Sequence, residues 1–202
     1  MRQRFVHDVS GLPDHDFGSD SIVWWGTLGF VAIEGMGFVL AVAVYFYLMR
    51  EVPSWPPGSI APPGLIYGSL FTGVLLVSAL PNHWAKRAAE RYRRRGSLLG
   101  MGGVVLLGIG LLVLRGFEFT VLHVRWDTNA YGSIVWTLLG LHTLHLGTDV
   151  ADTAVLLALF LTDRDPPQRR YTDVSENADY WWFVLLAWLP IFAVVYLVPR
   201  LG

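Results

Sequence analysis

Five long apolar segments, at residues 22–49, 64–82, 98–119, 131–161 and 180–198, fill most of this chain. Each reaches the length of roughly 17–25 residues that a helix needs to cross about 30 Å of hydrocarbon. Lipid offers no hydrogen-bond partner to a free backbone N–H or C=O group, so each segment is expected to be helical. The sequence therefore predicts an all-α, polytopic membrane protein with a bundle of five transmembrane helices.

The composition supports the same class. The chain has 53% hydrophobic residues, nine Trp and only 15% charged residues, which is unusual for a soluble domain of 202 residues. We expect residues 1–21 to form a cytoplasmic N-terminal segment and residues 22–202 to form the membrane domain. The first apolar segment is too long, and follows too many acidic residues, for a cleaved signal peptide. The chain has no Cys, which excludes disulfides, thiolate metal sites and iron–sulfur clusters on this chain.

Basic residues concentrate between the second and third apolar segments. Six of them follow one another closely: Lys86, Arg87, Arg91, Arg93, Arg94 and Arg95. Cytoplasmic loops carry an excess of Lys and Arg, so this loop is expected inside, which places the N-terminus inside and the C-terminus outside. Anionic lipid headgroups are its expected neighbours. A basic run can also bind nucleic acid, but its place between two spanning segments favours the orientation signal, and we expect no nucleic-acid partner.

Glu34 lies near the middle of the first apolar segment. A charged carboxylate at that depth costs about 2.5–3.5 kcal/mol on insertion scales. Because burial in hydrocarbon favours the neutral form of a carboxyl group, we expect a largely neutral Glu34 that donates or shares a hydrogen bond within the bundle. Two roles remain open for this residue, a proton relay or a hydrogen bond that fixes the packing of the first helix.

Four polar residues interrupt the fourth segment at intervals of three, four and three: His142, His145, Asp149 and Asp152. This spacing places all four on one stripe of a helix, which is expected to face protein or water. A neutral imidazole has one donor and one acceptor, so the stripe is suited to contact Glu34, a lipid headgroup or a neighbouring subunit. A direct contact with Glu34 is a hypothesis.

The two histidines of this stripe supply only part of a metal or haem site. A membrane-bound b-type haem normally takes axial histidines from facing helices. His83 and His123 lie at the ends of their segments and are poorly placed to complete such a pair with His142 or His145. We therefore expect core or interface histidines, with no metal and no cofactor on this chain.

Other residues in the segments favour structural roles. Arg115 and Glu118, three residues apart, are expected to form a local ion pair or an interface contact. Glycines of the third segment are expected to let helices approach closely: Gly100, Gly102, Gly103, Gly108 and Gly110. Aromatic residues at segment ends are expected to anchor in the membrane interface: Trp24, Trp25, Tyr45, Tyr47, Trp84, Trp126, Trp181 and Trp182. No nucleophile elbow or phosphate-binding motif is present in the sequence, so we predict no catalytic residue.

Several of these motifs follow one another in a familiar order. Arg-Gly-Phe-Glu-Phe at 115–119 precedes Asn-Ala-Tyr-Gly-Ser at 129–133 and a Gly-Leu-His-Thr-Leu-His-Leu run at 140–146. This order resembles subunit III of the haem-copper oxidases. Glu34 falls where that family places an intramembrane Glu, and the aromatic run at 180–184 looks like the start of the family's final helix. The resemblance covers nearly all of the chain after residue 22.

The resemblance implies a non-catalytic subunit of a respiratory haem-copper terminal oxidase, a complex that reduces oxygen to water. Haem and copper would lie on the catalytic subunit I, and this chain would dock against it beside the other oxidase subunits. Family members are credited with stabilising the catalytic subunit and supporting its proton uptake. Membrane lipids are further expected partners, and bound phospholipid is a candidate ligand. The expected location is the cytoplasmic membrane of a bacterium or archaeon.

The chain also departs from the family pattern. The usual member has seven helices, and this chain resembles the short form without the first two, whose cleft against the other five holds lipids in the long form. In the last segment, Trp182 and Leu185 stand where the family often has His and Asp. Gly35 and Gly37 interrupt the bulkier run that follows the Glu, which is expected to favour a closer helix approach.

Two other functions remain open. A related short subunit accompanies nitric oxide reductases, and purification with a copper-bearing partner would favour the oxidase. A stand-alone proton-coupled carrier would use Glu34 and the His-Asp stripe as its relay. Against the carrier, we find no internal repeat, and the segments 64–82 and 180–198 contain no charged residue.

Overall fold

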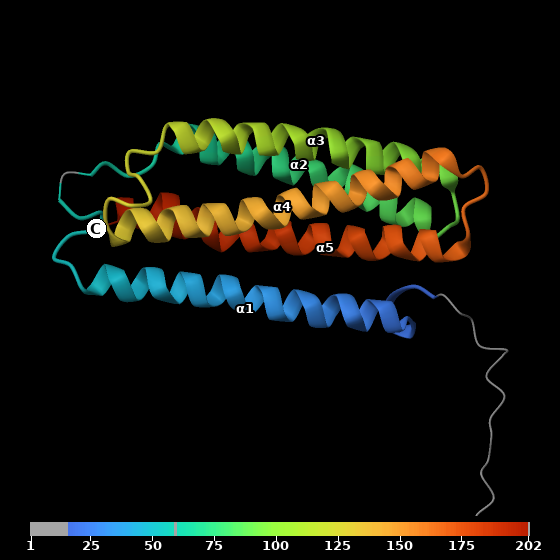
Figure 1. Ribbon diagram of the computed structural model, residues 1–202, viewed down its shortest axis with the longest axis horizontal. Coiled ribbons are helices and arrows are strands. Elements are labelled where there is room, and N and C mark those ends of the chain that lie inside the picture. Colours follow the sequence, from blue (N-terminus) through green and yellow to red (C-terminus); the bar gives the residue numbers. More distant parts are fainter. Residues whose placement is uncertain (1–15, 59, 202) are drawn as a thin grey trace, which may run out of the picture.

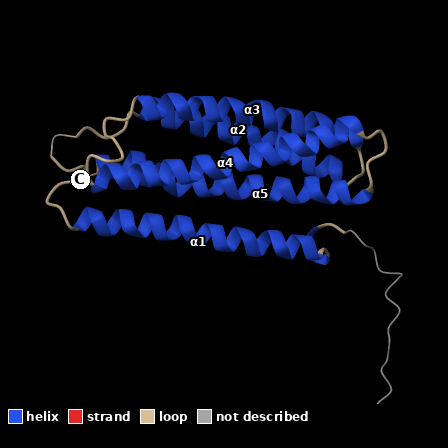
Figure 2. Cartoon of the chain, in the orientation of Figure 1, coloured by secondary structure: helices blue, strands red, loops and turns tan. Residues whose placement is uncertain are grey.

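The computed structural model describes residues 16–58 and 60–201, so most of the expected N-terminal segment lies outside the described residues. Over the described residues the chain forms five long helices and no strand (Figures 1 and 2). Their bounds are α1 Ile22–Arg50, α2 Leu65–Ala89, α3 Arg94–Thr120, α4 Ala130–Thr162 and α5 Gln168–Phe192. All five are long and apolar enough to cross a membrane, which confirms the predicted all-α architecture.

The helices form one elongated bundle, with α2 and α3 along one side, α1 along the other, and α4 and α5 between them (Figure 1). The closest association is between α2 and α3, whereas α1 contacts mainly α4 and α5. Only Phe38 and Tyr45 of α1 are buried. Most of the apolar surface of α1 is therefore left for lipid or for a partner chain.

Small residues account for the close approach of α2 and α3. A Cβ atom added at Gly100 would lie 2.7 Å from the Cα atom of Ala85, and one at Gly103 would lie 2.9 Å from the Cβ atom of Pro81. The predicted packing role of the glycines is thus confirmed at these positions, and also at Gly108, which faces Val150 and Trp181. It is wrong for Gly102 and Gly110, where an added Cβ would meet open space.

Two of the aromatic residues expected at the membrane interface lie in the core instead. Trp181 of α5 is 1% exposed and donates its indole N–H to Ser78 Oγ of α2 over 2.9 Å. Tyr45 is fully buried, and its hydroxyl accepts the Trp55 indole N–H over 2.7 Å. A buried indole needs an acceptor, and the acceptor of Trp181 lies 103 positions away in the sequence, so hydropathy at a segment end does not reveal it.

Two helices extend by about two turns or more beyond the predicted apolar segments. α5 begins at Gln168 instead of near residue 180, and α2 continues to Ala89 instead of ending near residue 82. The added turns contain polar residues, but the apolar side chains of these turns pack with α3 and α4. Together they form a second core cluster at the end of the bundle that carries the α2–α3 and α4–α5 turns: Ala85, Ala89, Met101, Phe160, Tyr171 and Val174. Tertiary packing of one face stabilises these amphipathic turns, which the hydrophobicity of the sequence alone does not indicate.

Candidate functional site

Glu34 lies where α1, α4 and α5 meet. Its Oε2 atom accepts a hydrogen bond from the Tyr180 hydroxyl of α5 and lies 3.4 Å from His145 Nε2 of α4. The side chains of Glu34 and His145 are 22% and 12% exposed. The hypothesis of a direct contact between Glu34 and the stripe is therefore confirmed for His145.

The other ring nitrogen of His145 decides how protons are shared in this pair. His145 Nδ1 lies 2.7 Å from the carbonyl oxygen of Leu141. A carbonyl oxygen only accepts, so Nδ1 carries a proton. A hydrogen bond between Nε2 and Glu34 then requires either a carboxylic acid beside a neutral imidazole, or a carboxylate beside an imidazolium. The pair is neutral overall in both forms, which suits its place within the membrane.

His142 does not contact Glu34. It is fully buried, and its Nε2 atom lies 3.0 Å from the carbonyl oxygen of Val184 in α5. Its ring packs against Trp188 and Phe71, with ring centroids 5.0 and 5.8 Å apart. His142 is therefore a core residue that connects α4 to the backbone of α5, and the Glu34 hypothesis is wrong for this histidine.

The two aspartates of the stripe have different surroundings. Asp149 is 1% exposed and accepts a hydrogen bond of 2.7 Å from Asn177 Nδ2 of α5. The amide oxygen of Asn177 accepts in turn from the Thr153 hydroxyl over 2.8 Å. Asp152 is exposed on the outside of the chain. The stripe thus faces protein at His142, His145 and Asp149, whereas Asp152 is exposed at the open cleft between α1, α4 and α5.

A cleft of about 700 Å³ lies beside Glu34 between α1, α4 and α5. Four carboxylates line it, from Glu34, Asp152, Asp173 and Glu176, and none of its lining residues is a Lys or Arg. Along α1 the lining runs from Val23 to Glu34. Glu34 therefore lies at the end of an acidic cleft that begins near the start of α1, and the cleft connects the Glu34–His145 pair with the surface.

Arg115 and Glu118 form the ion pair that their spacing predicts. Arg115 Nη1 lies 2.6 Å from Glu118 Oε2, with the two side chains 1% and 2% exposed. The guanidinium also lies over the rings of Phe71 and Trp188, 3.9 and 4.5 Å from the ring centroids. Within this chain the pair is already buried by the helix core, so it is a local ion pair and not a contact for another subunit.

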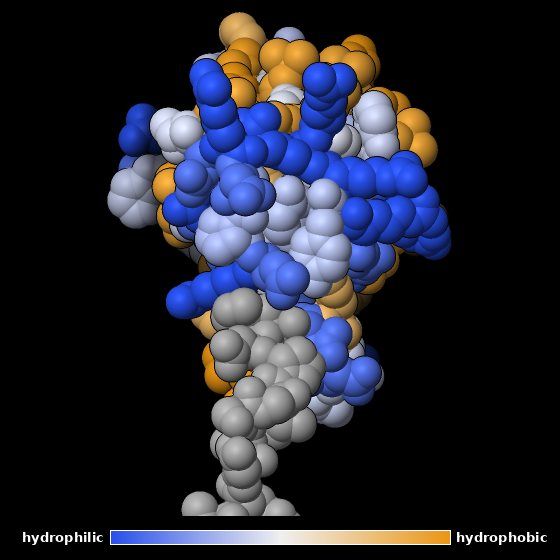
Figure 3. Space-filling view, turned by 90° about the vertical axis from the view of Figure 1, so that its right-hand side faces the viewer, coloured by the Kyte–Doolittle hydropathy of each residue, from blue (hydrophilic) through white to orange (hydrophobic). Residues whose placement is uncertain are grey.

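The basic residues between α2 and α3 divide into two groups. Lys86 pairs with Asp179 of α5, and Arg94 donates to the carbonyl oxygens of Phe160 and Asp163, over 2.5 and 3.0 Å. The remaining members of the run, Arg87, Arg91, Arg93 and Arg95, line a hollow at the end of the bundle, and Arg94 also contributes to its lining. The end of the molecule that carries the α2–α3 and α4–α5 turns is strongly hydrophilic, with hydrophobic side chains around part of its rim (Figure 3).

Comparison with known proteins assigns the family. A family model described as cytochrome c oxidase subunit III matches residues 8–199, and so includes all five helices. The chain belongs to the cytochrome c oxidase subunit III family. The resemblance noted at residues 115–146 therefore extends through nearly the whole sequence.

Individual relatives within this subunit III family come from different groups of organisms. The chain is 24% identical to cytochrome c oxidase subunit 3 of Synechocystis over 195 residues, which cover 95% of this chain and 79% of that protein. It is 26% identical over 192 residues to a probable cytochrome c oxidase subunit 3 of Mycobacterium leprae, covering 91% and 92%. It is also 26% identical over 199 residues to the cytochrome bo(3) ubiquinol oxidase subunit 3 of Pseudomonas aeruginosa, covering 97% and 94%.

Sequence reasoning missed two residues of this subunit III site. Tyr180 was expected only as part of an aromatic run, and Asn177 was not considered. Both lie on α5, which runs antiparallel to α4 so that Asn177 meets Asp149 and Val184 meets His142. The spacing of seven residues is the same on both helices. A polar residue seven positions before Val184, facing the His-Asp stripe, was the signal available in the sequence.

The two positions of α5 that depart from the family pattern pack among apolar side chains. Leu185 is 3% exposed in the main core cluster, and Trp182 packs against the same cluster while partly exposed. A Cβ added at Gly35 would lie 3.6 Å from the Phe183 ring, an ordinary van der Waals contact, and one at Gly37 would meet open space. The expected closer helix approach is therefore wrong at both positions.

Proposed function

We propose that this chain is the accessory subunit III of a respiratory haem-copper terminal oxidase. The observation that carries the proposal is the match of the family model to residues 8–199, which leaves little of the chain unaccounted for. Relatives in the same family are named as subunits of cytochrome c oxidases and of a ubiquinol oxidase. Their names support the assembly of this chain with other oxidase subunits and leave the electron donor open between cytochrome c and quinol.

In this proposal the haems and copper lie on the catalytic subunit I, and this chain contributes no redox group. His142 and His145 each place one ring nitrogen against a backbone carbonyl oxygen, of Val184 and Leu141. Among the described residues, no group of three or more His, Asp or Glu is arranged to hold a metal ion. The exposed apolar faces of the helices are available for docking in the membrane.

The acidic cleft supports a role in proton uptake by the complex. Protons attracted to its carboxylates would meet Glu34, which lies 3.4 Å from His145 Nε2 and accepts a hydrogen bond from Tyr180. Such a pair can hold one proton on either Glu34 or His145 and stay neutral overall, so that no isolated charge is left among the helices. The proposed function of the site is therefore to hold protons near the cytoplasmic entrance of the catalytic subunit and to stabilise that subunit.

The test is purification through an affinity tag on the full chain in mild detergent, followed by a reduced-minus-oxidised optical spectrum and identification of the co-purifying chains. The proposal predicts haem absorbance that follows a larger, copper-bearing chain. A partner without copper would favour the subunit that accompanies nitric oxide reductases. A colourless protein without partners would favour a carrier, and haem retained by this chain alone would overturn the structural assignment of His142 and His145.

We also propose that the protein resides in the cytoplasmic membrane of a bacterium or archaeon, with the α2–α3 turn inside. The five apolar helices and the bacterial relatives support this location. The hydrophilic, Arg-rich end of the bundle supports the orientation, since cytoplasmic ends of membrane proteins are enriched in Lys and Arg.

A further inference from the structure

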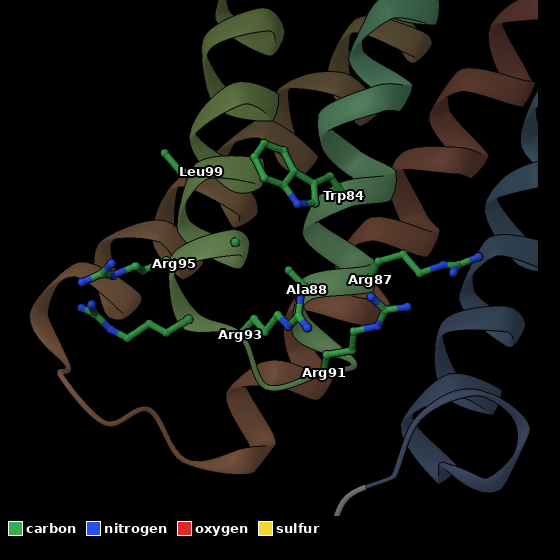
Figure 4. A pocket seen from close by; sticks show the side chains of 9 residues that line it. Trp84, Arg87, Ala88, Arg91, Arg93, Arg95 and Leu99 are labelled. Atoms are coloured by element: carbon green, nitrogen blue, oxygen red, sulfur yellow. The ribbon is translucent and has the colours of Figure 1, made fainter.

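A hollow of about 560 Å³ lies at the turn between α2 and α3, well away from Glu34 (Figure 4). Its polar side is formed by the exposed arginines Arg87, Arg91 and Arg93, and Arg95 extends in the opposite direction from Arg87. Trp84 of α2 lies above these arginines, on the side toward the membrane-spanning part of the helices. The hollow therefore has a cationic end and an apolar end.

The geometry of the turn explains why the arginines gather there. Two hydrogen bonds of 2.8 Å end α2, from Arg93 N–H to the Ala88 carbonyl and from Tyr92 N–H to the Ala89 carbonyl. Tyr92 has a φ of 52°, the left-handed conformation that usually follows a helix in this closing pattern. The chain thus reverses over the four residues between the two helices, and the arginines before and after the turn meet around one hollow.

These arginines lack a partner that would balance their charge. Lys86 and Arg94 of the same run are engaged by Asp179 and by backbone carbonyls. In the part of the chain that the structure describes, Arg87, Arg91 and Arg93 make no ion pair. Cations held so close repel one another, and an anion placed among them would relieve that repulsion. Guanidinium groups match the geometry of a phosphate, to which they donate two parallel hydrogen bonds.

The apolar end of the hollow favours an amphiphile over a soluble anion. The side chains of Trp84 and Leu99 are 53% and 64% exposed, one on each helix. Below them α2 and α3 touch, since a Cβ added at Gly96 would lie 2.7 Å from the Cβ atom of Ala88. The small residues leave a groove between the two larger side chains. The Trp84 indole N–H belongs to this half-exposed side chain and lies at the boundary of the two ends, where it can donate to a headgroup.

We propose that this hollow binds one anionic phospholipid. Its phosphate lies among Arg87, Arg91 and Arg93, and one acyl chain runs along the groove between Trp84 and Leu99. The site is distinct from the acidic cleft, whose carboxylates would repel such a headgroup. The proposal does not depend on which partner chains assemble with this protein.

The experiment measures bound lipid by native mass spectrometry of the tagged full chain, with any chains that co-purify, after delipidation in detergent. Dioleoylphosphatidylglycerol is added back, with dioleoylphosphatidylcholine as the uncharged comparison. The test variant is Arg91→Gln/Arg93→Gln. The matched control is Arg164→Gln/Arg169→Gln, which removes the same charge from exposed residues of the α4–α5 turn region at the same end of the bundle.

We expect the test variant to bind its tightest phosphatidylglycerol roughly 25-fold more weakly, because each of the two cations removed contributes roughly a fivefold factor near an anionic lipid. The control variant and the wild type should bind it equally. An equal loss in both variants would overturn the proposal, since it would mean that the lipid senses only the overall charge of this end. Equal retention of phosphatidylcholine and phosphatidylglycerol by the wild type would overturn it as well.

A second arm separates a lipid site from a site for free phosphate. Trp84→Ala should weaken phosphatidylglycerol binding while leaving all the arginines in place. Inorganic phosphate at millimolar concentration should fail to displace the lipid. Displacement by phosphate, together with unchanged lipid binding in Trp84→Ala, would show that the hollow takes a soluble anion and would overturn the phospholipid assignment.

Discussion

The carboxyl oxygen Oε2 of Glu34 in α1 lies 3.4 Å from Nε2 of His145 in α4. Tyr180 of α5 donates to the same oxygen, so three helices meet at one polar point. The other inward side chains of α1 that are buried are the aromatic Phe38 and Tyr45. This polar contact therefore orients a helix that otherwise has little packing to fix its position against α4 and α5.

The first prediction concerns the energetic coupling of this pair. A double-mutant cycle of Glu34→Gln and His145→Ala, measured by unfolding in detergent, should give a coupling energy of about 0.5–3 kcal/mol, because the two side chains touch. The matched cycle of Glu34→Gln with His142→Ala should be additive within about 0.5 kcal/mol, since His142 bonds to the Val184 carbonyl instead. Additivity in the His145 cycle would show that the contact contributes nothing.

The second prediction concerns the protonation of Glu34. An infrared difference spectrum of wild type minus Glu34→Gln at neutral pH should contain the C=O stretch of a protonated carboxyl group, because a membrane interior favours the neutral acid. Tyr180→Phe should shift this band by removing the hydroxyl donor. Asp20→Asn, at an exposed residue outside the five long helices, serves as the control and should change only carboxylate bands. If the wild-type minus Glu34→Gln spectrum contained carboxylate bands instead, Glu34 would be ionised and His145 would be the imidazolium.

Much of this site follows from local patterns in the sequence. The period of the stripe places His142, His145 and Asp149 on the inner side of α4, and the spacing of Arg115 and Glu118 within one helix predicts their ion pair. Partners from other helices depend on how neighbouring helices are aligned along the bundle. The contact of Glu34 with Tyr180, separated by 146 positions, is of this second kind.

The bounds of the helices also depend partly on local sequence patterns and partly on contacts between helices. The apolar cores of all five are evident from hydrophobicity, but the first turns of α5 contain Thr172, Ser175 and Glu176, which are buried by neighbouring helices. A hydropathy criterion assigns such residues to a loop. These polar residues are part of a helix because neighbouring apolar side chains of the same turns pack into the second core cluster at this end of the bundle. Hydropathy along the sequence does not reveal that tertiary contact.

The third prediction concerns the contact between α2 and α3. Gly100→Ala should destabilise the protein by about 1–3 kcal/mol, because the new Cβ would lie 2.7 Å from backbone atoms of Ala85, which cannot move without separating the helices. Gly102→Ala is the control on the same helix. Its Cβ meets open space, so the change should be neutral or stabilise the helix by up to about 1 kcal/mol. Thermal unfolding of both variants in the same detergent makes the comparison, and equal effects would contradict the close contact.

The fourth prediction concerns the buried ion pair. Arg115→Met should cost about 3–5 kcal/mol, because it leaves the Glu118 carboxylate buried without its cation. The double variant Arg115→Met/Glu118→Met removes both charges and should recover part of this loss. Arg125→Met is the control, since Arg125 pairs with Asp127 on the exposed surface, where such a pair contributes about 0–1 kcal/mol. If the double variant were less stable than Arg115→Met, the two side chains would be acting independently.

The fifth prediction concerns the orientation of the bundle. The chain has no Cys, so single cysteines can be introduced without a background. Ser54→Cys and Asp165→Cys lie at exposed residues in loops at opposite ends of the molecule (Figure 1). Because the Arg-rich end should face the cytoplasm, a membrane-impermeant maleimide added to intact cells should label Ser54→Cys and spare Asp165→Cys.

Labelling after the membrane is opened with detergent provides the control for this orientation experiment, since both cysteines should then react. The reverse pattern in intact cells would place the α2–α3 turn outside. It would also move the start of the acidic cleft beside Glu34 to the outer side of the membrane. A proton taken up through that cleft would then come from outside the cell, and the proposed support of cytoplasmic proton uptake would have to be abandoned.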